Sequence, residues 1–167
     1  MGLDSFMQDK KDITAELTLR PASMDDVDIL YEWRNDPEVR KWSFNTDEIL
    51  YETHVQWLKS VLLRDDVEIY IMMENEIPVG QIRVTFCQDD VEIGYSIDKG
   101  CRGRNWGQKM ITLMENKLRN DPRARRGGIY FVAYVKKRNE ISKRIFERLN
   151  YQKEEQQRWI RYSKEIG

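Results

Sequence analysis

The segment that most constrains the fold runs from a strand, through a loop rich in glycine and arginine, directly into a helix. Apolar residues alternate with small or polar ones over residues 91–98, which predicts a strand with two different faces. Residues 99–106 form the loop. An apolar stripe starting at Trp106 predicts a helix that ends before Pro122. One face of the strand then carries Glu92, Gly94, Ser96 and Asp98.

The start of that helix has the properties of an anion site. The first N–H groups of a helix have no partner within the helix, and the helix dipole adds positive character there. Arg102 and Arg104 add full charges, while Gly103 and Gly107 allow a ligand to approach the backbone closely. Such an arrangement suits a pyrophosphate. Taken alone it is weak evidence, because most glycine-rich turns before helices are only turns.

The other segments predict an α/β (α+β) fold. The expected architecture is a mixed, twisted central sheet of about six or seven strands with helices on both faces. Residues 17–167 are read as one domain, and residues 1–16 as a flexible N-terminal lead-in. The further predicted elements are strands at 17–20, 67–73, 79–86 and 129–135, helices beginning near Ser23, Thr46 and Asn139, and one or two final strands after Tyr151.

Composition excludes several functional classes. The 28 basic residues nearly balance the 29 acidic ones, so no global basic field exists for nucleic acid. No apolar run approaches the ~20 residues that span a bilayer, and the N-terminal residues lack an apolar signal core, so we expect a cytoplasmic protein with no membrane partner. With two cysteines and one histidine, no metal site is expected and the cysteines are read as reduced thiols.

Two motifs in the expected order carry a resemblance to a known family. Residues 102–107 read Arg-Gly-Arg-Asn-Trp-Gly and resemble the Q/R-x-x-G-x-G/A loop of the GCN5-related N-acetyltransferases (GNAT). Residues 139–151 resemble the family's N-x-x-A-x-x-x-Y-x-x-x-G-F helix. The resemblance covers residues 17–162 and implies the GNAT fold, acetyl-CoA as cofactor, and transfer of an acetyl group to a primary amine by direct attack on the thioester.

Three positions depart from the family pattern. Asn105 stands where the loop usually has glycine, and Asn150 replaces the glycine after the last helix. Asparagine tolerates left-handed backbone dihedrals, so both turns are expected to survive. Phe146 occupies the position of a tyrosine that protonates the leaving thiolate in many members, so this chain must use another donor, such as a water, or let the proton of the product amine reach the thiolate.

The resemblance also implies which residues hold the cofactor. In the family the fourth and fifth strands splay apart, and the pantetheine arm lies between them. A backbone N–H near residues 94–96 is then expected to face the thioester oxygen. Asn139 is either a helix cap, a cofactor contact, or both. The residues implied in cofactor binding are Tyr95, Ser96, Ile97, Asp98, Arg102, Gly103, Arg104, Asn105, Trp106, Gly107, Gln108, Asn139, Ser142 and Arg144.

Two residues are candidates for acid–base chemistry. Glu92 lies one pleat from the expected thioester and is the preferred base, with a solvated or salt-bridged strand glutamate as the competing interpretation. His54 is an alternative base or acceptor-binding group. Because it falls on the apolar stripe of the second helix with Leu50 and Trp57, a packed, hydrogen-bonded histidine is the favoured interpretation.

The acceptor is indicated only by a resemblance to a subgroup. Residues 31–58 resemble enzymes that acetylate the 4-amino group of nucleotide-linked amino sugars, here a UDP-linked sugar. The same opening occurs in relatives acting on ribosomal-protein N-termini, aminoglycosides and polyamines. A peptide N-acetyltransferase and a non-catalytic acyl-CoA-binding module therefore stay open, and the family also allows a homodimer. Candidate acceptor residues are Arg34, Asn35, Trp42, Phe44 and Trp57, with Arg40 as a further diphosphate contact.

Overall fold

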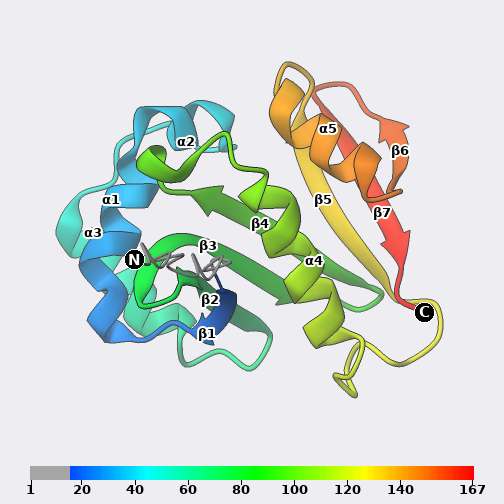
Figure 1. Ribbon diagram of the computed structural model, residues 1–167, viewed down its shortest axis with the longest axis horizontal. Coiled ribbons are helices and arrows are strands. Elements are labelled where there is room, and N and C mark those ends of the chain that lie inside the picture. The colour runs from blue at the N-terminus through cyan, green and yellow to red at the C-terminus, as the bar shows by residue number, and fades with distance from the viewer. Residues whose placement is uncertain (1–15) are drawn as a thin grey trace, which may run out of the picture.

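The computed structural model describes residues 16–167 and shows a seven-stranded sheet with helices on both faces (Figure 1). The strand order is β1-β2-β3-β4-β5-β7-β6, and only β4 and β5 run parallel, so the sheet is mixed as predicted. The predicted lead-in lies, apart from Glu16, outside the described residues. The strands are β1 Leu17–Pro21, β2 Val67–Glu74, β3 Ile77–Phe86, β4 Asp90–Ile97, β5 Tyr130–Lys136, β6 Gln152–Glu155 and β7 Trp159–Glu165.

Two hydrophobic clusters pack against opposite faces of the sheet. The larger cluster joins α4 and α5 to the inward side chains of β2–β5 and β7, including Met110, Ile111 and Phe146. The smaller cluster joins α1 and α3 to β2 alone, through residues such as Leu30, Leu58 and Ile71. The helices are α1 Val27–Asn35, α2 Pro37–Trp42, α3 Tyr51–Val61, α4 Trp106–Leu118 and α5 Glu140–Arg148, with single 3-10 turns at η1 Met24–Asp26 and η2 Lys99–Cys101.

Strands β4 and β5 pair over only three residues. Asp90, Val91 and Glu92 lie beside residues 130–132, and no pairing continues from Ile93 onward. The two strands then diverge toward the end of β4 that enters the loop before α4 (Figure 1). The splay expected from the family resemblance is confirmed.

Both asparagine substitutions adopt the left-handed backbone that glycine usually supplies. Asn105 has φ 59° and Asn150 has φ 64°, so these two turns survive the loss of glycine as predicted. Ser23, near which a helix is expected to begin, forms a capping box with Asp26 at η1. The turn before α4 also uses Gly103 at φ 82°.

The region between α1 and α3 differs from the prediction. Asp36-Pro37 ends α1 as expected, but it also starts α2, because Asp36 Oδ1 accepts from the Glu38 N–H (2.9 Å) and Pro37 takes the first helical position. Trp42 therefore ends a helix and does not lie in a loop. Thr46 caps nothing. Helix α3 begins only at Tyr51, because Asn45 Oδ1 accepts the Asp47 N–H in a local turn instead.

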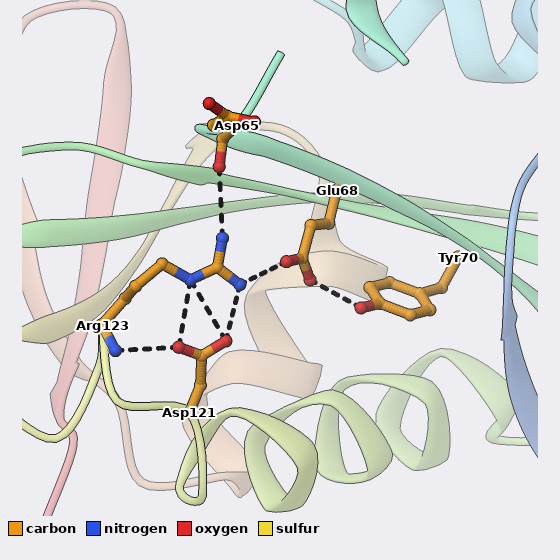
Figure 2. A network of polar contacts seen from close by, with 5 residues as sticks. All are labelled: Asp65, Glu68, Tyr70, Asp121 and Arg123. Atoms are coloured by element: carbon orange, nitrogen blue, oxygen red, sulfur yellow. Dashed lines mark hydrogen bonds and ion pairs between the residues drawn. The ribbon is translucent and has the colours of Figure 1, made fainter. Parts of the chain in front are cut away.

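A polar network connects the loop between α4 and β5 to the start of β2 and to Asp65 just before it (Figure 2). Arg123 donates to Asp121, to Glu68 and to the carbonyl oxygen of Asp65 (3.2 Å). The Tyr70 hydroxyl donates to the second oxygen of Glu68 (2.6 Å). Because every guanidinium nitrogen of Arg123 has an acceptor, this residue acts as a clamp. Arg123 together with Asp65, Glu68 and Asp121 is called the Arg123 clamp below.

Within residues 16–167, no helix is both long enough and apolar enough to cross a membrane.

Candidate active site

The divergence of β4 from β5 exposes a particular set of backbone groups. The Asp98 N–H donates to the Val79 carbonyl (2.9 Å), and the Cys87 N–H donates to the Asp90 carbonyl (2.8 Å). In an antiparallel pair such bonds recur at every second residue, so the even-numbered residues of β4 point their backbone groups toward β3. The backbone groups of Tyr95 and Ile97 therefore point toward the open side.

This alternation narrows the predicted cofactor contacts on β4. The N–H expected near residues 94–96 belongs to Tyr95, because the backbones of Ser96 and Asp98 are turned toward β3. The side chain of Ser96 is buried and accepts from Gln81 Nε2 (3.1 Å). Asp98 accepts from Trp33 Nε1 (2.8 Å) and from the Gly100 N–H (2.8 Å), so its carboxylate is used within the fold.

The loop before α4 leaves the helix start open to a ligand. Asn105 occupies the N-cap position but makes no capping hydrogen bond with its side chain, so the first-turn N–H groups have no side-chain acceptor. Arg104 is about half exposed beside this turn, with its guanidinium 4.8 Å from the Trp106 ring centroid. The local charge, the free N–H groups and the left-handed turn fit a pyrophosphate, as the sequence predicts.

Arg102 has a different role from the one its sequence position suggests. Its Nε donates to the Ile97 carbonyl (3.2 Å), and its Nη2 pairs with Asp36 (3.1 Å). The side chain therefore fastens the loop to the end of β4 and to the start of α2. Gly107 is needed for packing within the fold, because an added Cβ would lie 3.0 Å from Ile145 and 3.1 Å from Tyr95, and its contact with a cofactor stays a prediction.

A pair of hydroxyl groups bridges β4 and α5 beside the splay. The Tyr95 hydroxyl lies 2.7 Å from Ser142 Oγ, which also accepts from Asn139 Nδ2 (3.2 Å). Asn139 caps α5 by accepting the Ser142 N–H (3.2 Å), so its predicted capping role is confirmed. Burial raises the pKa of Tyr95 to about 12, so this hydroxyl keeps its proton at neutral pH. Phe146 is fully buried behind it.

The opposite face of β3, β4, β5 and β7 is polar. Helices α1 and α3 pack on β2 only, and the strands beyond it direct charged, polar and aromatic side chains to the same side. We call this surface the polar face. Sequence reasoning missed the members on β3, β5 and β7, because their grouping depends on strand register. Its members include Gln81, Arg83, Glu92, Ser96, Tyr134, Trp159 and Arg161.

Glu92 lies on the polar face, opposite Thr85 on β3 and Val132 on β5. Its side chain is half-buried. Among residues 16–167 no side chain forms an ion pair or hydrogen bond with it, whereas the neighbouring Asp90 pairs with Arg161 (3.3 Å). A salt-bridged strand glutamate is therefore not what the structure shows.

Three arginines come together where α1 and α2 meet this face. Arg34 is half-buried, and burial together with the nearby charges of Arg83 and Arg40 lowers its pKa. One polar atom of Arg34, Nη1, and one of Arg40, Nε, are buried without a hydrogen-bond partner in the described chain. Arg34 Nη2 donates to the Asn45 carbonyl (3.1 Å). Arg83, Arg34 and Arg40 are called the arginine cluster below.

The structure separates the two interpretations of His54. Its side chain is only 2% exposed, its Nε2 lies 3.0 Å from the Val27 carbonyl, and its ring packs beside Tyr31 and Trp57. Burial lowers its pKa. The packed, hydrogen-bonded interpretation is confirmed, and nothing in this geometry supports a role as the base.

Other residues predicted near the acceptor have contacts or exposure that differ from the prediction. Asn35 donates to the Ile49 carbonyl and accepts the Ile49 N–H, both at 2.8 Å, so it joins the end of α1 to the segment before α3 instead of facing a ligand. Leu50 and Trp57, expected on a buried stripe, are 75% and 40% exposed. Leu50 falls outside the stripe because α3 begins only at Tyr51, whereas His54, Leu58 and Val61 on the predicted stripe are buried.

An aromatic cluster connects the segment after α2 to the far strands. Phe44 is exposed and meets Trp159 edge-on, with ring centroids 5.7 Å apart, and Trp159 meets Tyr134 in the same way. Lys136 Nζ donates to the Lys41 carbonyl (3.0 Å) nearby. The Lys41 ammonium lies over the half-buried Trp42 ring at 4.7 Å. The predicted pair Trp42 and Phe44 thus lies beside the polar face.

Comparison with known proteins identifies the class. The acetyltransferase (GNAT) domain model matches residues 16–152, so the chain belongs to this family. Aminoglycoside N(6')-acetyltransferase type 1 from Klebsiella pneumoniae is 30% identical over 122 residues, and a protein of the same name from Serratia marcescens gives the same values. The match covers 64% of this chain and spans 61% of the length of those relatives.

Solved structures share the fold at lower identity. A domain from Methanocaldococcus jannaschii has a TM-score of 0.75 at 24% identity, covering 90% of this chain and 98% of that one. The aminoglycoside acetyltransferase AAC(6')-Ib in complex with coenzyme A has a TM-score of 0.76 at 19% identity, covering 90% and 95%. A ribosomal-protein alpha-N-acetyltransferase in complex with coenzyme A has a TM-score of 0.76 at 18% identity, covering 92% and 95%.

No cluster of three or more histidine, cysteine, aspartate or glutamate side chains in the described part of the chain is arranged to hold a metal ion.

Proposed function

We propose that this chain is an acetyl-CoA-dependent N-acetyltransferase that transfers an acetyl group to a primary amine by direct attack on the thioester. The observation that carries the proposal is the splay of β4 from β5, which begins at Ile93 and lies beside the open start of α4. Family membership supports the same activity. The expectation of a cytoplasmic enzyme and of a homodimer stays a prediction.

The residues present fit acetyl-CoA. The first-turn N–H groups of α4, with Arg104 beside them, suit its pyrophosphate, and the backbone edge at Tyr95 and Ile97 suits the amide groups of its arm. Further contacts from Trp106, Gln108 and Arg144 remain predictions. When bound, acetyl-CoA would supply an acetyl group activated as a thioester.

Two groups of this chain then have chemical roles. We assign to the Tyr95 N–H the role of donor to a developing oxyanion, since the edge of β4 that faces β5 is unpaired beyond Glu92. Glu92 lies on the polar face, half-buried and without an ion-pair partner in the described chain, so it is free to accept a proton from an amine. Glu92 is our proposed base.

A proton donor for the leaving thiolate is also needed, because Phe146 has none to give. The hydroxyl groups of Tyr95 and Ser142 lie beside the splay, on the side of α4 and α5. The raised pKa of Tyr95 keeps its hydroxyl protonated. We assign this role to the hydroxyl pair, which would give a proton to the thiolate and take one back from solvent. Ser142→Ala should therefore lower kcat more than it changes the affinity for coenzyme A.

Acceptor classes can be ranked by chemistry. We favour the 4-amino group of a UDP-linked amino sugar, supported by aromatic side chains at Trp42 and Phe44 and by Arg34 beside the polar face. An aminoglycoside is the second candidate, because the curated relatives carry that name. A peptide N-terminus is the third, from the name of one structural neighbour. A non-catalytic acyl-CoA-binding module is the alternative to all three.

The test is a screen of acetyl-CoA consumption by thiol release, run beside calorimetry of acetyl-CoA binding. The amines are UDP-linked 4-amino sugars, aminoglycosides, polyamines and short peptides. Turnover of any one identifies an enzyme and its acceptor class. Binding without turnover on every acceptor supports the binding module, and a failure to bind acetyl-CoA contradicts the proposed function.

A further inference from the structure

The arginine cluster is electrostatically incomplete. Arg34 Nη1 and Arg40 Nε are buried with no acceptor among residues 16–167. An unpaired buried polar atom costs free energy, and more so when it belongs to a charged group. Other arginines near the site do not share this feature, since Arg102 pairs with Asp36 and Arg161 pairs with Asp90. An anion would supply acceptors for both atoms and offset the charge of the cluster.

Among residues 16–167, no acidic side chain pairs with Arg34 or Arg40. The charged groups that act most strongly on Arg34 are both cations, Arg83 and Arg40. Asp36, which lies between Arg34 and Arg40 in the chain, is already bonded to Arg102 and to the Glu38 N–H. Three like charges gathered without a counter-charge repel one another, so the arrangement costs stability unless a ligand compensates for it.

The cluster lies on the acceptor side of the sheet. Arg83 on β3 is directly opposite Gly94 on β4, and its side chain emerges on the polar face with Glu92. Gly94 adds no side chain between them, and nothing lies within 4 Å of the place where its Cβ would be. A group bound by the arginines and an amine that reaches Glu92 are therefore close enough to belong to one small molecule.

We propose that the acceptor amine carries an oxyanion, a phosphate or a carboxylate, and that the arginine cluster binds it. This inference rests on the proposed acetyltransferase function and names its substrate class. A guanidinium presents paired N–H donors that match phosphate and carboxylate oxygens, and three of them suit a multiply charged diphosphate best. A polycationic aminoglycoside would meet repulsion at this place, despite the name of the curated relatives.

The first experiment measures anion binding without catalysis. The full chain is saturated with coenzyme A, which covers the loop before α4, and is titrated with inorganic pyrophosphate, UDP and uridine by calorimetry. Arg83→Gln is the test variant, because Arg83 is exposed and its loss should not harm folding. Arg125→Gln is the matched control, an exposed arginine in the α4–β5 loop.

The expected result is a loss of pyrophosphate and UDP affinity of about tenfold or more in Arg83→Gln, with no change in Arg125→Gln. Arg83→Lys should recover part of the affinity, because it restores the charge but not the paired donors. Equal affinity for both anions in wild type and Arg83→Gln would overturn the inference. Coenzyme A affinity is measured in the same samples, so a failure of the proposed function shows separately as absent cofactor binding.

The second experiment distinguishes the sources of the oxyanion. Thiol release is compared for a UDP-linked amino sugar, an amino sugar phosphate, an amino uronic acid, a neutral amino sugar and an aminoglycoside. Preference for either phosphate compound or for the carboxylate supports the inference and names the group. In each case Arg83→Gln should raise KM more than it lowers kcat. Preference for the neutral or the polycationic amine, unaffected by Arg83→Gln, would refute it.

Discussion

The Arg123 clamp and the arginine cluster use the same side chain in opposite ways. Arg123 is surrounded by acceptors from Asp121, Glu68 and Asp65, and the network extends to Tyr70 (Figure 2). Arg34 and Arg40 each have a buried donor with no acceptor among residues 16–167. The clamp connects the start of β2 to the chain after α4, whereas the cluster borders the polar face.

The difference shows how a fold separates structural charge from functional charge. Arg123 stabilises the fold because all its hydrogen-bond acceptors belong to the chain itself. Its guanidinium holds the pKa of the partner carboxylate Asp121 below the usual range. Arg34 has an unpaired donor and Glu92 has no ion-pair partner in the described chain, so neither group stabilises the fold through an ion pair. Unpaired charges on the polar face should therefore affect ligands, and paired ones should affect stability.

The largest effect is expected from Glu92→Gln. If Glu92 accepts the proton of the amine, its loss should lower kcat by about 10²–10⁴-fold, while the free energy of unfolding changes by no more than about 0.5 kcal/mol. Steady-state thiol release and urea unfolding measure the two quantities. Glu76→Gln, an exposed turn residue, is the control. A kcat equal to wild type would move Glu92 out of the mechanism.

Arg123→Gln should lower stability and leave activity unchanged, the reverse of Glu92→Gln. It removes several hydrogen bonds to Asp121 and Glu68, and the free energy of unfolding should fall by about 1–2 kcal/mol, a range that allows for the partial exposure of Arg123. The activity of the folded protein should stay at the wild-type level. Urea unfolding beside Arg125→Gln measures the change. A loss of activity without a loss of stability would place the clamp in the functional region.

The clamp should also respond to acid. Arg123 lowers the pKa of Asp121 in the folded state, so the pair stabilises the protein fully above the unfolded pKa of about 4 and loses this contribution as pH falls through the lower folded value. The stability difference between wild type and Arg123→Gln should shrink over this acidic range. Unfolding free energies at pH 7, 5, 4 and 3 would reveal a constant difference if the pair were not responsible.

Arg83→Gln should have the smallest effect on stability. Removing one of three like charges relieves repulsion on Arg34, so the free energy of unfolding should stay unchanged or rise by up to about 0.5 kcal/mol. Thermal unfolding without ligand measures this. A clear loss of stability would show that Arg83 has a partner within the fold, and the contrast with the clamp would disappear.

Local signals in the chain predicted most of the fold. The alternation over residues 91–98, the stripe from Trp106 and the apolar run before Val135 each produce the expected element. Asn105 and Asn150 take left-handed dihedrals as expected. Helix α2 was missed because six residues are too few for helical periodicity, and Asp36-Pro37 acts as both a stop and a start signal.

The candidate site was predicted less completely. Glu92, the loop before α4 and the α5 cap follow from motifs that are contiguous in sequence. The burial of His54 and the use of Asn35 as a clamp on Ile49 depend on how α1 meets α3, which no local pattern contains. The pairing of Arg123, just after Pro122, with Glu68 on β2 is likewise a long-range contact.

The sequence by itself determined most of the element order, the left-handed turn before α4 and the family, because each depends on neighbours within a few residues or turns of the chain. Only the tertiary structure decided which charges are paired. Arg34 and Arg83 are far apart in the chain, and they come near each other because α1 packs on β2 and strand register places Arg83 of β3 next to it. Whether a charge finds a partner is a long-range property, and here it separates the clamp from the proposed acceptor site.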